Sequence, residues 1–401
     1  MTAHDSPSTP ESGPARSISS FTHELFGHLP RADQRRWAQA YLQGLLTTGG
    51  KKSVRRLAAS VSASPTAFQS LQQFINASPW DWAPARQELM RWVEERAVPR
   101  AWLIGLAVMP KRGDRSVGVH RRFVHAAGRT INCQVGIGGF LSTASGDFPV
   151  DWQLLLPGQW CQDEDLRQRT RIPDGARRRH AWAYVLDLVQ SVAARTAHAA
   201  VPVVADMTEL SEAGALVNGL GRAGHGFVLA VPGSLRVVPA TKLPTALGRA
   251  GQEAQRPLTA QRFLHLVGWQ HPHIAPAGTP GGGHHVRIHS AVARLPTPDR
   301  HDQSYRLFTE GRPGKQTPGR IWITNLMNLR VDELLALTRL ETRTAATLRT
   351  LAEDFGLLDF EGRSFPGWHH HMTLVSAAYA YRLLAETDGV PYGTLLGERI
   401  A

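Results

Sequence analysis

Cysteine is scarce in this sequence, whose 401 residues include only Cys133 and Cys161. Two thiols exclude a framework of several disulfides and a zinc site built from cysteines. They suit a reducing compartment, and we expect a cytoplasmic protein. No run of apolar residues reaches the roughly 18 positions that a membrane-spanning helix needs. We therefore expect no contact with a membrane.

The beginning of the chain lacks the apolar stretch of a signal peptide. Its first residues, MTAHDSPSTPESGPARS, are polar and contain proline and serine. A segment of this composition cannot bury enough apolar surface to offset the entropy lost on ordering. We expect residues 1–17 to form a disordered tail.

Acidic side chains are outnumbered by basic ones. The sequence has 45 Lys and Arg against 33 Asp and Glu, which gives a formal charge of +12. Such a surplus favours a polyanionic partner, and nucleic acid is the commonest one. A generally arginine-rich proteome is the alternative explanation, and composition alone does not separate the two.

Residues 18–98 carry a helical pattern of apolar residues. Phe21, Leu25 and Leu29 recur at helical spacing, and similar series follow as far as Pro84. We expect about five helices in this N-terminal domain. One segment adds a cluster of cations, either a solvated face or a surface that contacts phosphates: Lys51, Lys52, Arg55 and Arg56.

The pattern changes near residue 99. AWLIGLAV is a short continuous apolar run, typical of a buried strand, and two further strands are predicted around Ala127-Gly128. Helices and a strand that ends at Asp206 follow. Alternating strands and helices over 99–227 predict an α/β fold compatible with a ribonuclease-H-like core. Residues 228–324 predict an inserted strand-rich subdomain, and 325–401 predict the helical end of the core.

Several blocks in this order resemble bacterial insertion-sequence transposases of the insertion sequence 701 family, a branch of the DDE superfamily. The blocks are YLQGLL (41–46), KKSVRRLA (51–58), SLQQFINASPWDW (70–82), PKRGDRSVGVHRRF (110–123), GRTINCQV (128–135), LLLPGQW (154–160), RIPDG (171–175) and GLLDFEGRSFPGWHHHMTLVSAAYAY (356–381). The last block is the most specific. The resemblance runs nearly from end to end and implies a ribonuclease-H-like fold.

Members of such a family cut and join DNA. The resemblance implies three carboxylates that hold two Mg²⁺ ions, because Mg²⁺ prefers hard oxygen ligands. One metal activates a water or a DNA 3′-hydroxyl, and the other stabilises the leaving oxygen. Each carboxylate position can be compared with this sequence.

Only one of the three family positions clearly keeps its carboxylate. The first aspartate would lie just before Pro110-Lys111, where this chain has Gly105 followed by Leu106. The second corresponds to Asp206. Counting back without gaps from GLLDFEGRS, the glutamate position falls on Ala345, and a lysine position further on falls on Ala352.

Other groups could replace the missing ligands or take another role. Asp114, Glu209 and Glu361 are the carboxylates considered as substitutes, and Asp206 alone would hold a metal weakly at most. The tract His369-His370-His371 resembles a metal site in composition. In the family block we expect it to pack near the cleft or contact the DNA backbone.

The sequence leaves three functional hypotheses. The first is a transposase-like protein that binds double-stranded DNA without cutting it, as a relic or a recruited regulator. The second is an active Mg²⁺-dependent transposase with an atypical metal site, and the third is an interaction protein or unrelated enzyme on the same fold. The sequence also leaves a homodimer as one possible assembly. The candidate phosphate contacts are Lys51, Arg55, Arg56, Lys111, Arg121, Arg122 and Arg363.

Overall fold

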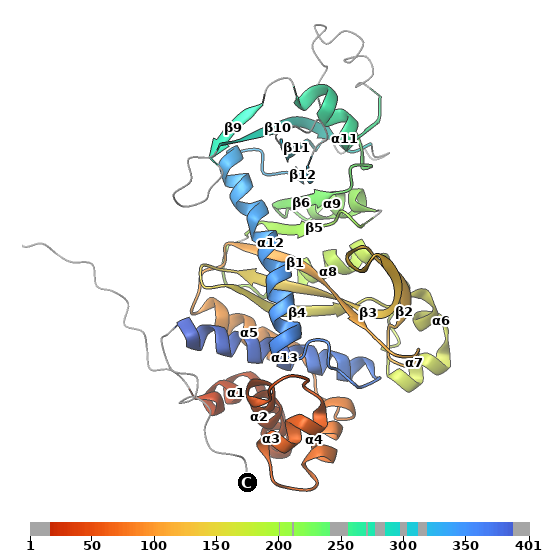
Figure 1. Ribbon diagram of the computed structural model, residues 1–401, viewed down its shortest axis with the longest axis vertical. Coiled ribbons are helices and arrows are strands. Elements are labelled where there is room, and N and C mark those ends of the chain that lie inside the picture. The colour runs from red at the N-terminus through yellow and green to blue at the C-terminus, as the bar shows by residue number, and fades with distance from the viewer. Residues whose placement is uncertain are drawn as a thin grey trace, which may run out of the picture.

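A computed structural model describes residues 17–199, 201–210, 212–240, 256–269, 272–276, 285–296, 303–311 and 319–387. The predicted tail, residues 1–17, lies outside this range except for Ser17, as does the end of the chain from 388. Figure 1 shows strands stacked along the long axis of the molecule, with a group of helices at the lower end. No helix in the described ranges is long and apolar enough to cross a membrane.

Five helices fill the described chain before its first strand. They are α1 (Ile18–Phe26), α2 (Ala32–Thr47), α3 (Val54–Val61), α4 (Ala67–Asn76) and α5 (Ala83–Glu94). In α3, Val54, Leu57 and Val61 recur at helical spacing and are buried, while Arg55 and Arg56 point outward. The buried face of α3 packs against α2 and α4.

The last described helix, α13 (Phe365–Thr387), completes this helical group. Every residue from Gly367 to Tyr381 is buried, so the rest of the protein encloses this part of the helix on all sides. It contacts α2, α4 and α5 on one side and strand β4 on the other. Figure 1 shows α13 lying between the lower helices and the sheet. The two ends of the described chain therefore share one core.

The core sheet has the strand order of the ribonuclease-H-like fold. Its strands are β1 (Ala101–Pro110), β2 (His120–Val124), β3 (Arg129–Ser142), β4 (Asp147–Leu154), β5 (Val203–Asp206) and β6 (Phe227–Val231). β3 runs antiparallel to both β1 and β4, whereas β5 is parallel to both β1 and β6. The order β4-β3-β1-β5-β6 confirms the predicted α/β class.

Helices cover both faces of this sheet. They are α8 (Ala181–Arg195), α9 (Ala213–Arg222) and α12 (Val331–Asp354), whereas the short helices α6 (Gly158–Gln162) and α7 (Glu164–Thr170) pack on each other. A Cβ atom added at Gly139 of β3 would meet Leu188 of α8, whereas one added at Gly105 of β1 would meet Thr344 of α12. Gly139 pairs with Ile104, the neighbour of Gly105, so α8 and α12 lie on opposite faces.

The strand-rich segment after β6 continues the same sheet. Its elements are β7 (Arg236–Pro239), β8 (Leu258–Thr259), α11 (Ala260–Phe263), a π-helical turn (Leu264–Gly268), β9 (His273–Pro276), β10 (His285–Arg294), β11 (Tyr305–Glu310) and β12 (Ile321–Thr324). β12 pairs with β6, and the order runs on through β11, β10 and β7 to β8. The segment expected as an inserted subdomain thus extends the edge of the core sheet.

Candidate functional site

Gly105 and Asp206 lie side by side in the centre of the sheet. β1 and β5 pair in parallel, with Ile104 opposite Ala205, and the next position brings Gly105 beside Asp206. Side chains at matched positions of parallel strands point to the same face. Both positions therefore face α12, as the order of the motifs predicted.

The first family position has no room for a carboxylate. A Cβ atom at Gly105 would lie 2.7 Å from the γ-methyl of Thr344, 3.1 Å from the ring of Phe140 and 3.2 Å from Leu348. Contacts below about 3 Å fall inside the van der Waals minimum near 3.5–4.0 Å. An aspartate here would require the side chain of Thr344 to turn away or α12 to shift from β1.

The carboxylate that α12 brings to Asp206 is Glu341. Arg320 joins the two acids, because its Nη2 lies 3.0 Å from Asp206 Oδ2 and its Nη1 donates to Glu341 Oε2. Ala345, where the gap-free count placed the glutamate, is exposed. Glu341 precedes Thr344 by three residues and so shares its face of the helix. Sequence reasoning missed Glu341, although it lies one turn before the counted position.

Both oxygens of Asp206 have partners. Oδ1 accepts hydrogen bonds from the backbone nitrogen of Thr208 at 2.9 Å and from its hydroxyl at 2.6 Å, while Oδ2 faces Arg320. Burial raises the pKa of the Glu341 carboxyl; the charge of Arg320 opposes this shift, and the charge of Asp206 adds to it. Asp206, Glu341 and Arg320 thus form a cluster in which two carboxylates share one guanidinium.

These residues do not fit a two-metal centre. Three carboxylates are the expected ligands, yet Gly105 offers none and Arg320 occupies the space between the other two acids. Within the ranges that the structure describes, no three His, Cys, Asp or Glu side chains gather closely enough to hold a metal. Mg²⁺ would have to displace a guanidinium with two partners.

The three carboxylates considered as substitutes lie elsewhere. Asp114 is exposed in the loop after β1. Glu209 lies 3.1 Å from Nδ1 of His125 and 3.9 Å from Arg122. Glu361 forms an ion pair of 2.9 Å with Lys51. The hydrogen bonds and ion pairs of Glu209 and Glu361 join them to groups other than Asp206.

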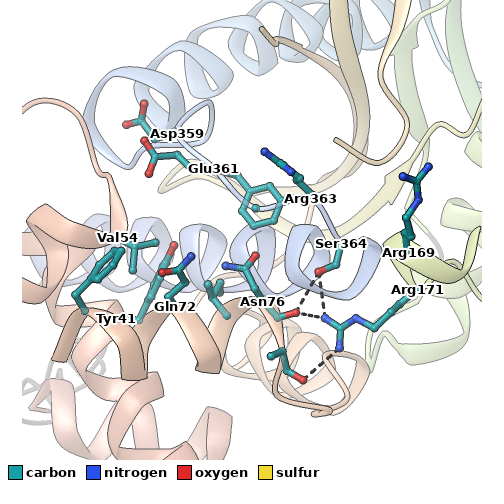
Figure 2. A pocket seen from close by; sticks show the side chains of 15 residues that line it. Tyr41, Val54, Gln72, Asn76, Arg169, Arg171, Asp359, Glu361, Arg363 and Ser364 are labelled. Atoms are coloured by element: carbon teal, nitrogen blue, oxygen red, sulfur yellow. Dashed lines mark hydrogen bonds between the residues drawn. The ribbon is translucent and has the colours of Figure 1, made fainter. Parts of the chain in front are cut away.

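A groove of about 660 Å³ opens between the N-terminal helices and the loop before α13 (Figure 2). Arg169 and Arg171 lie toward one end in Figure 2, Asp359 and Glu361 toward the other, and Arg363 between them. The remaining walls are Tyr41, Val54, Phe68, Gln72, Ile75, Asn76, Ala77, Phe360, Gly362 and Ser364. The arginine end can receive an anion of extended shape.

Arg171 holds three segments together at this end of the groove. Its guanidinium donates to the backbone oxygens of Asn76 and Ala77 and, at 3.1 Å, to the hydroxyl of Ser364 (Figure 2). Those carbonyls belong to the end of α4, where a cation also meets the negative end of the helix dipole. Arg171 has a positive φ of 56°, rare for a residue with a side chain.

Four of the predicted DNA contacts lie at the groove. Lys51 pairs with Glu361, Arg55 covers the ring of Phe68 at 4.8 Å, and Arg363 lines the wall. Lys111 donates to the backbone oxygen of Phe360 at 2.6 Å, and burial lowers its pKa to about 8. Its ammonium is therefore mostly charged at neutral pH.

The other three predicted contacts lie apart from that wall. Arg56 donates to the backbone oxygen of Gly49 at 2.8 Å. Arg121 and Arg122 belong to β2, in the hairpin that β2 forms with β3. Arg121 is exposed, while Arg122 is half-buried near Glu209. The hairpin and the groove are thus two separate basic surfaces.

The histidine tract is buried and joins α13 to the N-terminal helices. His369 stacks on Trp82 with ring centres 4.4 Å apart and accepts from Arg86 at 3.1 Å. Both ring nitrogens of His370 face backbone oxygens, and His371 accepts from the hydroxyl of Tyr41 at 2.9 Å. Side chains this deeply buried pack the core and do not contact a DNA backbone.

Comparison with known proteins gives the family of the chain. A family model described as DDE superfamily endonuclease matches residues 24–284, well over half of the chain, and the chain belongs to this family. The chain resembles a solved piggyBac transposase, described as a synaptic complex with hairpin DNA, with a TM-score of 0.45 and 11% identity. That match covers 94% of this chain and 75% of the other. Among curated proteins none matches.

Proposed function

We propose that this member of the DDE superfamily binds double-stranded DNA and does not cut it. The motif blocks support descent from transposases of the insertion sequence 701 family. The proposed inactivity rests on the missing carboxylate at Gly105, where a Cβ atom would lie only 2.7 Å from the γ-methyl of Thr344. Without that ligand and with Arg320 between the other acids, no metal pair is positioned for in-line attack on phosphorus.

The groove supplies the surface for DNA in this proposal. Arg169 and Arg363 lie on its wall with no carboxylate partner among the described residues, and Lys51 and Lys111 flank the same loop. Phosphates would accept from these side chains while the acidic end of the groove excludes the backbone. The hairpin with exposed Arg121 offers a second contact.

Binding is tested by fluorescence anisotropy with a labelled duplex across a salt series. The affinity should fall steeply with salt, since each neutralised phosphate releases counterions. The double variant Arg169→Glu and Arg363→Glu should bind at least about tenfold more weakly at low salt, with a shallower salt slope. Each single variant, Arg169→Glu or Arg363→Glu, is compared with the control Arg349→Glu, which makes the same change of charge at an exposed site on α12 outside the groove.

The outcome of that series separates the alternatives. Arg121→Glu is measured in the same way. If it alone weakened DNA binding, the hairpin and not the groove would be the DNA-binding surface. No binding even at low salt would exclude the DNA-binding proposal and favour an interaction protein on the same fold.

Cleavage is tested separately, with DNA that carries the native element ends. We expect neither nicking nor joining with Mg²⁺ or Mn²⁺. Metal-dependent cleavage that disappears in Asp206→Ala would contradict the proposal and establish an active enzyme with an atypical site. Because the core is tightly packed around the altered site, we favour a recruited regulator over a decaying relic. A fixed genomic position without terminal inverted repeats would support recruitment.

A further inference from the structure

Arg320 occupies an unusual place for a cation on the surface of a sheet. It directly precedes β12, and its guanidinium reaches across the sheet face to Asp206 at the end of β5. From the other side, Glu341 of α12 pairs with the same group. The ring of Trp322 lies 5.7 Å from the guanidinium carbon. One side chain thus connects two strands and a helix.

The two acids need such a partner because they lie close together and are poorly hydrated. Only 15% of the Glu341 side chain and 25% of the Asp206 side chain is exposed. Like charges in such a place either share a proton or bind a cation. A guanidinium satisfies both, since its planar donors reach two carboxylates in different directions.

We propose that Arg320 is a built-in counter-ion that has replaced a divalent metal at this site. The Asp206 and Glu341 carboxylates are then a latent site for Mg²⁺ or Mn²⁺, closed by a side chain of the same protein. Removing the guanidinium opens that site. The inference does not depend on DNA binding, and it concerns one cation rather than the pair that cleavage requires.

The proposal predicts that metal ions do not change the stability of the folded protein. Adding EDTA, Mg²⁺ or Mn²⁺ to the unaltered chain should leave its melting temperature unchanged, because the acids already have their cation. A protein that used a metal at this position would lose stability on chelation. Thermal unfolding with and without EDTA measures this directly.

The decisive experiment titrates Mn²⁺ into the Arg320→Met variant, with calorimetry and the electron paramagnetic resonance signal of free Mn²⁺ as readouts. We expect one site that binds at least about tenfold more tightly than any site in the unaltered chain. The same site should disappear in Arg320→Met combined with Glu341→Gln. Arg349→Met removes an exposed arginine from α12 and should bind no additional metal.

Arg320→Lys guards against a variant that fails to fold. Its ammonium keeps the charge but cannot donate to both acids in the same planar geometry, so Mn²⁺ affinity should rise by a smaller factor than with methionine. If neither variant binds Mn²⁺ more tightly than the unaltered chain, the proposal is wrong. It is equally wrong if the unaltered chain binds Mn²⁺ and Asp206→Asn abolishes that binding.

Discussion

At Gly105 the space for a side chain is taken by Thr344, Phe140 and Leu348. We expect Gly105→Ala to lower the free energy of unfolding by about 1–3 kcal/mol, the usual effect of overpacking a core. Urea denaturation measures the change. Thr344→Ala removes the nearest methyl group and should recover part of the loss in the double variant.

Gly175→Ala is the matched control, since a Cβ atom there would meet nothing within 4 Å. If Gly105→Ala were as stable as this control, α12 would not pack on β1 as described. The same packing argues that restoring aspartate at Gly105 alone will not restore cleavage, because the carboxylate has no space beside Asp206.

The neutral ring of His371 stabilises the junction between α13 and the N-terminal helices. Burial lowers its pKa to about 4, and its Nδ1 accepts from the hydroxyl of Tyr41 while Nε2–H donates to the backbone oxygen of Gly356. The unfolded chain takes up a proton near pH 6.5 and the folded one does not. Stability is therefore fully present above pH 6.5 and is lost as the pH falls toward 4.

Between pH 7 and pH 5 this linkage should cost about 2 kcal/mol of unfolding free energy. Urea denaturation at both pH values should show that His371→Gln is less sensitive to acid by about this amount. The same replacement at exposed His23 serves as the control. Equal pH dependence in the unaltered chain and in His371→Gln would contradict this role.

The residues at the site show how far sequence reasoning reached. The adjacency of Gly105 and Asp206 followed from the motif order, because two strands of one fold fix it. Glu341 did not follow, because counting along a chain cannot show which turn of a long helix faces the sheet. The packing of the buried side of α12, including Thr344 on Gly105, sets that rotation of the helix.

Among the elements, α4, α7 and the loop before α13 meet at Arg171. Replacing Arg171 by alanine removes the donors to Asn76, Ala77 and Ser364. The strain of a Cβ atom in the left-handed conformation does not change, because arginine and alanine both carry that atom. We expect a loss of about 2–3 kcal/mol in the free energy of unfolding.

Arg171→Gly tests the strain of the backbone conformation at this position. It loses the same hydrogen bonds but adopts φ of 56° without strain, so it should be more stable than Arg171→Ala by about 1 kcal/mol. Chemical denaturation of both variants provides the comparison. If the glycine variant were the less stable of the two, the backbone conformation at this position would not be strained.

The strands after β6 were predicted as pieces but not as a sheet. Alternating apolar residues in HHVRIHSAVARL and the run IWIT indicate strands by local pattern alone. Their partners are distant in sequence, since β12 pairs with β6 across about ninety intervening residues. The pairing of strands depends on contacts between such distant segments, and a single sequence does not indicate which segments meet.

On the scale of the whole molecule, the N-terminal helices depend on α13. The Tyr41 hydroxyl is hydrogen-bonded to His371, and Arg86 donates to His369 and Thr373. The ring centres of Phe21 and Tyr381 lie 5.1 Å apart. We expect a chain truncated after Arg363 to lose its protection from limited proteolysis within residues 18–94. Supplying residues 364–401 as a separate polypeptide should restore some protection.

A peptide of the same composition in scrambled order is the control for that experiment. Unchanged cleavage rates in the truncated chain would mean that α1 to α5 form a stable domain by themselves. Mass spectrometry of the early fragments identifies which helices have opened.

The shared core also sets the order in which the protein can be completed during synthesis. A ribosome that adds about 5–20 residues per second needs roughly 15–60 s to travel from the end of α5 to the end of α13. During that time only the surfaces of the first helices that pack on α13 stay uncovered, and these are open to a chaperone. A stop codon near the end of the gene would therefore disable the beginning of the protein as well.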